Sequence, residues 1–362
     1  MRLIRILLIA LLGAGSAPSA SAAEEVDGGV QEEVAPPGSP EARKAARKAA
    51  RLARQQDPNR LETGLFPGAA YDSNLGVGTG IVGNLARLDE RLWPYRWRLA
   101  AQVFLYGDIG ASGEPEVTFV HNYADLDAIG LLGGRLRLRA RVWFKRQVDA
   151  GWYGLGNASQ ASEPWAGLEE GSEGYVAARR FHEFDAIEAG GRATARLPLA
   201  RDLEFFGGLS LAWIWPTIYP GSRLELDLAG ASGEATRRAL VGAERHGVLQ
   251  GLGGLLWDTR DDEADPQRGV LNEISLRGGP VIEADSGFLG ANLHVRAYLP
   301  VVPYYLTVGL RGMADVLLGD PPFYELARAG SYWPIEALSG PVGLRGMPAR
   351  RYHGKVKLLG SL

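Results

Sequence analysis

The sequence contains no cysteine, and this absence excludes disulfides and thiolate metal sites. A chain that crosses an oxidising compartment while unfolded avoids wrong disulfide pairs in this way. After the first segment, no stretch approaches the ~18 apolar residues that a membrane-spanning helix needs. The net charge is only −3, and no signature of a nucleic-acid reader is present, so we expect no nucleic-acid partner.

Signatures of catalysis are also missing, and we predict that the protein is not an enzyme. No serine lies in a nucleophile-elbow pattern, which disfavours an outer-membrane hydrolase. The acidic segment from Trp257 to Gly269 lacks the oxygen register of a calcium loop. We interpret His294 as a hydrogen-bonded residue of a polar interior. The five histidines show no metal-ligand spacing, so neither a metal nor a cofactor is expected: His121, His182, His246, His294 and His353.

Glycine is abundant instead, with 49 residues and no collagen period, and this favours many strands and turns. Residues 1–22 have the pattern of a secretory signal peptide, with a basic start, a short apolar run and a small-residue cleavage site. Residues 23–62 are predicted to be a periplasmic tether with a short basic helix. This helix either contacts anionic lipid headgroups or is simply solvated.

From Thr63 onward, polar and apolar residues alternate with the period of a β-strand. In the clearest case Arg135, Arg137, Arg139 and Arg141 alternate with mainly aliphatic residues, so one strand face carries a basic stripe. Many such segments reach ten residues, the length that a tilted strand needs to cross a bilayer. Twelve strands are predicted, at 63–71, 76–88, 95–107, 115–126, 134–150, 180–198, 202–218, 246–260, 269–283, 287–300, 304–318 and 353–362.

Short and long connections alternate along these strands, and aromatic residues gather at strand ends, as in Trp213, Trp215 and Tyr219. Both features are typical of outer-membrane barrels. The sequence therefore predicts an all-β fold in which residues 63–362 form a transmembrane antiparallel β-barrel. Its place is the cell outer membrane of the Gram-negative type, where its partner is outer-membrane lipid.

Three segments resemble the barrel of the BamA/TamA family, the outer-membrane superfamily that includes the bacterial surface antigens. The first, WDTRDDEADPQRG, resembles a periplasmic turn motif at Asp258, Arg260, Asp261, Pro266, Arg268 and Gly269. The second is FYELARAG in the long late loop. The third, GLRGMPARRYHG, has Met347 where the family usually has an aromatic residue. It resembles the family's lumen loop motif at Gly343, Leu344, Arg345, Gly346, Arg350, Arg351 and Tyr352.

The resemblance implies a sixteen-stranded barrel whose long loop folds into the lumen, where Arg345 meets an acidic residue of the wall. Small flanking residues leave room there, and a guanidinium can bind a carboxylate through two bonds. In the family the acidic residue lies on a strand after the one that begins near His353. We therefore expect the C-terminus to be incomplete by roughly 80 residues. Otherwise the partner must be a residue such as Glu273 or Asp258.

The resemblance further implies that the protein assists the insertion or translocation of protein or lipid at the outer membrane. Its clients would be nascent outer-membrane proteins or lipids, and its helpers periplasmic or lipoprotein partners. Residues 23–62 are too few for the folded periplasmic domains by which the family's assembly factors capture substrates. The alternative is a passive channel whose lumen arginines favour anions.

Overall fold

The computed structural model describes residues 53, 57–72, 76–109, 115–157, 159, 162–169, 172–263, 265–303, 305–340 and 343–362. The predicted signal peptide at 1–22 lies outside these residues, and so does the basic helix of the predicted tether, apart from Ala53. Among the described residues, none of the helices combines the length and the apolar character that a membrane crossing requires.

The fold is all-β, as the alternation of the sequence predicts. Its strands form one antiparallel sheet in chain order, with the short β4 paired to the end of β3. The strands are β1 (Leu61–Asp72), β2 (Gly76–Asp89), β3 (Leu92–Ile109), β4 (Pro115–Phe119), β5 (Asn122–Leu131), β6 (Leu136–Gly151), β7 (Glu183–Pro198), β8 (Leu203–Ile218), β9 (His246–Asp258), β10 (Gly269–Ile282), β11 (Ser286–Val302), β12 (Leu306–Gly319) and β13 (Val356–Ser361).

The predicted strands match the observed ones to within a few residues, with one exception. The single strand predicted at 115–126 is two strands, β4 and β5. His121 lies between them with φ 55, a left-handed conformation that interrupts the extended chain. The prediction missed this break because the polar and apolar pattern continues across it.

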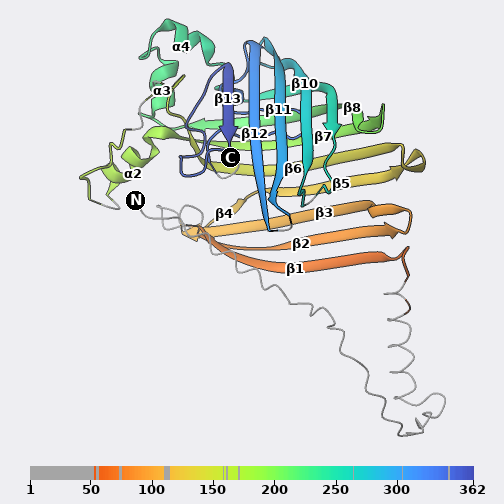
Figure 1. Cartoon of the computed structure of the whole chain (residues 1–362). Coiled ribbons are helices and arrows are strands. Elements are labelled where there is room, and N and C mark those ends of the chain that lie inside the picture. Colours follow the sequence, from red (N-terminus) through yellow and green to blue (C-terminus); the bar gives the residue numbers. More distant parts are fainter. Residues whose placement is uncertain are drawn as a thin grey trace, which may run out of the picture.

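The sheet curls strongly along its length. In Figure 1, β10 to β13 stand in front of β5 to β8 and cross them at a steep angle, while β1 to β3 extend away below. Within the described chain no ladder joins β13 to β1, so the curved wall remains open between these two edges. The structure is thus an antiparallel wall that is curved but not closed.

The two faces of this wall differ sharply in chemistry. On β10, Ile274 and Leu276 are 60% and 53% exposed, whereas Glu273, Ser275 and Arg277 between and beside them are 2%, 3% and 5% exposed. Strand pairing repeats this division across the sheet, since paired residues share a face. The convex face therefore exposes apolar side chains that include Leu99, Val103, Val142, Leu209, Leu211, Leu255, Leu293, Val295, Leu310 and Leu358.

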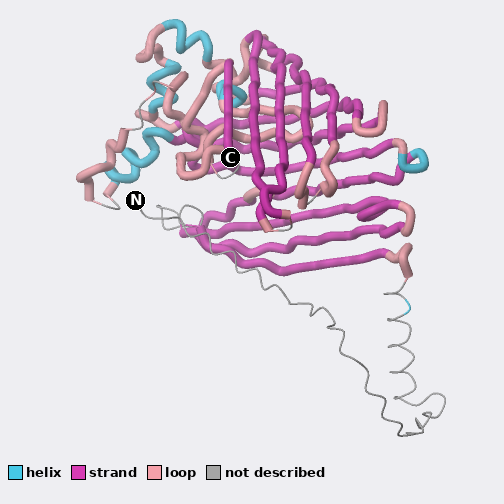
Figure 2. The backbone as a smooth tube through the Cα atoms, in the orientation of Figure 1, coloured by secondary structure: helices cyan, strands magenta, loops and turns pink. Residues whose placement is uncertain are grey.

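The concave side holds the connection between β12 and β13, residues 320–355, which we call the inner loop (Figure 2). The 3-10 helix η3 (Phe323–Leu326) is its most buried part. Two further 3-10 turns, η1 (Leu132–Gly134) and η2 (Arg180–His182), lie in other connections. The helices α2 (Glu173–Arg179), α3 (Arg223–Leu228) and α4 (Glu234–Ala239) gather at one end of the wall (Figure 1).

Candidate functional site

The inner loop is held on the concave face by apolar packing at its start. Phe323, Tyr324 and Leu326 are at most 2% exposed and join a cluster with Phe184 of β7 and with Trp152, which directly follows β6. The ring of Phe323 lies 4.9 Å from that of Phe184 and 5.9 Å from that of Trp152, at edge-on angles that aromatic pairs prefer. Burial of each such side chain stabilises the docked loop by about 1.5–3 kcal/mol.

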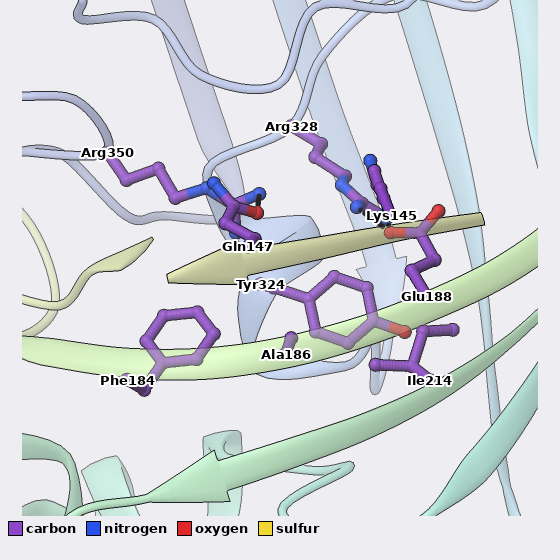
Figure 3. Close-up of a pocket in the computed structure, with 9 residues that line it drawn as sticks. All are labelled: Lys145, Gln147, Phe184, Ala186, Glu188, Ile214, Tyr324, Arg328 and Arg350. Atoms are coloured by element: carbon purple, nitrogen blue, oxygen red, sulfur yellow. Dashed lines mark hydrogen bonds and ion pairs between the residues drawn. The ribbon is translucent and has the colours of Figure 1, made fainter. Parts of the chain in front are cut away.

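A cluster of ion pairs joins the inner loop to β6 and β7 (Figure 3). Arg328 is its centre, with ion-pair distances of 2.6 Å to Glu188, 3.1 Å to Glu325 and 3.0 Å to Glu336. Lys145 of β6 adds distances of 3.3 Å to Glu188 and 3.0 Å to Glu336. Because Glu188 belongs to the wall and the other two carboxylates to the loop, this cluster fastens one to the other.

Arg350 fastens the far end of the same loop. It is 2% exposed, and its Nη2 donates to Gln147 of β6 at 2.6 Å and to Glu336 at 3.0 Å. The cavity between these residues and Tyr324 measures about 10 Å³, roughly the space of one water molecule (Figure 3). This cavity is too small for a substrate larger than water, so the residues around it form a contact surface between the loop and the wall.

The surroundings of the inner loop lower the pKa values of Glu336 and His353. Desolvation inside the curve of the wall would raise the pKa of Glu336, but the charges of Arg328, Lys145 and Arg350 outweigh it and hold the pKa well below its ordinary value. The Glu336 side chain nevertheless keeps 57% of its surface open to the interior, so water screens these pairs. His353 is 1% exposed, and burial, followed by nearby positive charges, lowers its pKa to about 3.

A second buried network connects four strands with the loop. Asp315 of β12 is 0% exposed and pairs with Arg277 of β10 at 2.6 Å and with Lys357 of β13 at 3.0 Å. It also accepts hydrogen bonds from Asn292 of β11 at 3.3 Å and from the backbone N–H of Gly330 at 3.2 Å. One carboxylate thus holds the register of β10 to β13 and a turn of the inner loop.

The predicted lumen loop motif, residues 343–352, lies in the inner loop, but among the described residues Arg345 makes no hydrogen bond or ion pair with the wall. Gly343 is needed because a Cβ there would lie 1.8 Å from the Leu338 carbonyl oxygen. Arg345 is exposed, as is Gly346, and in the described chain no ion pair joins Arg345 to a carboxylate. If no later strand supplies the partner, the sequence predicts a residue such as Glu273 or Asp258. Neither forms an ion pair with Arg345. Its expected partner on a later strand stays a prediction.

The other motif residues hold the loop in place. Leu344 packs with a buried cluster of the loop and wall, and its N–H donates to the Leu338 carbonyl at 2.7 Å. Arg351 donates to Ser159 Oγ at 2.7 Å, and Tyr352 donates to the Met347 sulfur at 3.6 Å. Arg350, described above, makes a buried contact with the wall, but its wall partner is the amide of Gln147, and its acidic partner, Glu336, belongs to the loop.

The predicted periplasmic turn motif is the tight connection between β9 and β10. Arg260 bonds both oxygens of Asp258, at 2.9 and 2.8 Å, and Asp261 accepts from the backbone N–H groups of Gln267 and Arg268. Gly269 has φ 104, and a Cβ there would lie 2.4 Å from the Thr259 carbonyl. Pro266 lies within this turn, where its side chain is half-buried. These residues shape a turn and bring no reactive groups together.

The predicted basic stripe lies on the concave face but is paired with acids of the neighbouring strand. Arg137 contacts Asp127 at 2.7 Å, Arg139 contacts Asp127 at 3.7 Å, and Arg141 contacts Asp125 at 3.3 Å. Arg135 lies in the turn before β6 and is exposed. Asp125 and Asp127 belong to β5, although the sequence placed Asp127 in a turn after the strand predicted at 115–126. Arg137 also pairs with Glu263, between β9 and β10, at 2.9 Å.

The most buried contacts of the loop were missed by sequence reasoning. Arg328 lies in FYELARAG, a segment singled out without a role for its arginine. Asp315, Glu188 and Lys357 each stand in the polar register of a predicted strand, which was the only signal available. Within the described residues, no group of three or more histidines and carboxylates is arranged to hold a metal ion.

No family model and no curated protein sequence matches the chain. Among solved structures, the chain is similar to the crystal structure of BamA from Haemophilus ducreyi lacking POTRA domains 1–3. The TM-score is 0.43 at 12% sequence identity, and the match covers 75% of this chain and 45% of that one. The matched part thus spans less than half of the length of that structure.

Proposed function

We propose that the protein is an outer-membrane β-barrel protein that assists the insertion or translocation of protein or lipid at that membrane. The observation that carries this proposal is that the outer face of the wall is apolar and the inner face is polar, the opposite of a water-soluble protein. Apolar side chains cover the convex face, and charged residues with a folded loop fill the concave one. A water-soluble protein rarely exposes so continuous an apolar surface, whereas lipid tails cover it at no cost.

The assisting role rests on the inner loop and on the edge of the sheet at β1. Apolar packing, the Arg328 cluster and the Asp315 network hold the loop against the wall, so passage through the interior requires the loop to move. Among the described strands, β1 lies at an edge of the sheet and offers backbone N–H and C=O groups to which a client strand can pair. Periplasmic or lipoprotein partners would deliver such clients.

The alternative, an anion-favouring channel, receives less support. Lumen arginines suggested this alternative, and those of the stripe on β6 are paired with Asp125 and Asp127. The inner loop also occupies the interior. Conductance in planar bilayers separates the two functions. An assembly protein with a docked loop gives small, rare openings that grow in the Arg328→Ala variant, whereas an open channel conducts steadily without the substitution.

A direct test measures assisted folding. The purified chain is placed in liposomes, and an unfolded outer-membrane protein is added as client. Heat-dependent gel mobility then reports the folded fraction of the client over time. We expect faster client folding than in empty liposomes of the same lipid. Equal rates in the two preparations, from protein shown to be inserted, would reject the assisting role and leave the membrane location standing.

A further inference from the structure

The connection between β8 and β9, residues 219–245, contacts the start of the inner loop, and we call it the cap. It carries α3 and α4 at one end of the wall (Figure 1). Leu224 and Leu240 of the cap are 0% and 7% exposed, and both belong to the apolar cluster that contains Phe323 and Tyr324 of the inner loop. The cap and the inner loop therefore share one buried core.

Polar contacts join the same two segments. The backbone N–H of Phe323 donates to the Val241 carbonyl at 2.9 Å. The Tyr324 hydroxyl donates to Nε2 of His246, the first residue of β9, at 2.7 Å, and Nδ1 of this histidine lies 2.7 Å from the Glu244 carbonyl. Because these contacts hold the start of the inner loop, displacement of the cap would loosen it.

Trp152 lies where the cap meets the inner loop. It directly follows β6 and is 0% exposed. The centre of its ring is 5.9 Å from that of Phe323 and 4.4 Å from that of His353, which lie near the two ends of the inner loop. Its indole N–H donates to Asp227 Oδ2 of α3 at 3.0 Å. One side chain thus contacts the cap and both ends of the inner loop.

Asp227 fixes the indole and is itself fixed by the cap. It is 0% exposed, and its carboxylate also accepts from Arg223 Nε at 3.1 Å and from the Ser232 hydroxyl. In the described chain, no hydrogen bond or ion pair joins Asp227 directly to the inner loop. A buried N–H without an acceptor costs free energy, so the packing of Trp152 depends on the position of this carboxylate.

We propose that the cap controls the release of the inner loop, and that Asp227 is a positioning residue that transmits the position of the cap through the indole of Trp152. The proposal deepens the assisting role, because it rests on the inner loop as the barrier to passage. Release of this barrier then depends on a segment at one end of the wall as well as on the interior.

Thiol labelling of a Ser331→Cys probe tests the proposal, since Ser331 is a 1% exposed residue of the inner loop and the chain has no native cysteine. Asp227→Leu removes the acceptor at similar side-chain size. We expect it to make the labelling of folded protein about tenfold faster, since the indole loses a charge-assisted bond. Asp227→Asn keeps an acceptor for the indole and should restore most of the parent rate.

Glu234→Leu is the matched control, because it removes the same charge from an exposed ion pair of the cap. Its labelling rate should equal that of the parent. A second probe, Ala86→Cys, lies buried in β2 and reports opening of the wall itself. Heat-dependent gel mobility confirms that each variant is folded. Equal acceleration at both probes overturns the proposal, and so does an Asp227→Leu rate equal to that of Glu234→Leu.

The route through the indole has its own test. In a Trp152→Phe background the indole N–H is absent, so Asp227→Leu should add little further acceleration. An undiminished effect in that background would overturn transmission through Trp152. Labelling is measured without a client, so its failure is distinct from a failure of assisted folding in liposomes, which would reject the assisting role and leave these rates unchanged.

Discussion

Replacing Arg328 with alanine should release the inner loop from the wall. Removing one partner of a buried ion pair typically destabilises by about 3–5 kcal/mol. Lys145 remains 3.3 Å from Glu188, and water reaches Glu336, so we expect the lower end, about 3 kcal/mol. Such a change raises the undocked fraction of the loop about 100-fold.

Thiol labelling measures this fraction cleanly, because the chain has no native cysteine. Ser331 is 1% exposed, so a Ser331→Cys probe reacts only when the loop leaves the wall. We expect labelling of folded protein to become about 100-fold faster when Arg328→Ala is added, provided that undocking is faster than the reaction.

Arg345→Ala is the matched control for this experiment, since it removes the same side chain from an exposed position of the same loop. Its labelling rate should equal that of the parent. If Arg328→Ala labels no faster than Arg345→Ala, the ion-pair cluster does not hold the loop. If Arg345→Ala alone accelerates labelling, then the exposed arginine has a partner that these contacts do not reveal.

Three further predictions concern the fold. Asp315→Asn leaves two buried cations without a counter-charge and should lower stability by about 3–5 kcal/mol, whereas Asp320→Asn, at an exposed ion pair, should change the urea midpoint little. Gly269→Ala places a Cβ 2.4 Å from a carbonyl oxygen at φ 104. The resulting strain should cost about 1–3 kcal/mol of stability and lower the melting temperature. An unchanged melting temperature would contradict this account. The folded pKa of His353 is about 3 and the unfolded pKa about 6.5, so the unfolded chain binds the extra proton in this window and stability should fall as pH is lowered through it. His353→Phe should flatten the dependence of the urea midpoint on pH between 7 and 5, and an unaltered slope would assign it to other groups.

The strands were predictable because one physical pattern, alternation with period two, specifies both their positions and their faces. Ile274 and Glu273 show this, since the sequence alone placed them on opposite sides and the structure agrees. The break at His121 was not predictable, because a single left-handed residue leaves the alternation intact.

The loop contacts were only partly predictable, because they depend on which strand lies opposite each loop residue. The resemblance led to Arg345, yet the guanidiniums of the loop that contact the wall are those of Arg328 and Arg350. Likewise, the alternation placed the stripe of β6 on the concave face but gave no sign of Asp125 and Asp127, since register between strands is a tertiary property.

The position of the inner loop has a mechanical consequence. The loop leaves from β12 and returns to β13, and its hydrogen bonds and ion pairs reach β6 and β7 on the opposite side of the interior. It therefore links the two sides of the curved wall and limits changes in the curvature of the strands between them. The stretch from β1 to β3 lies beyond its attachment points, so bending of the wall should be concentrated there.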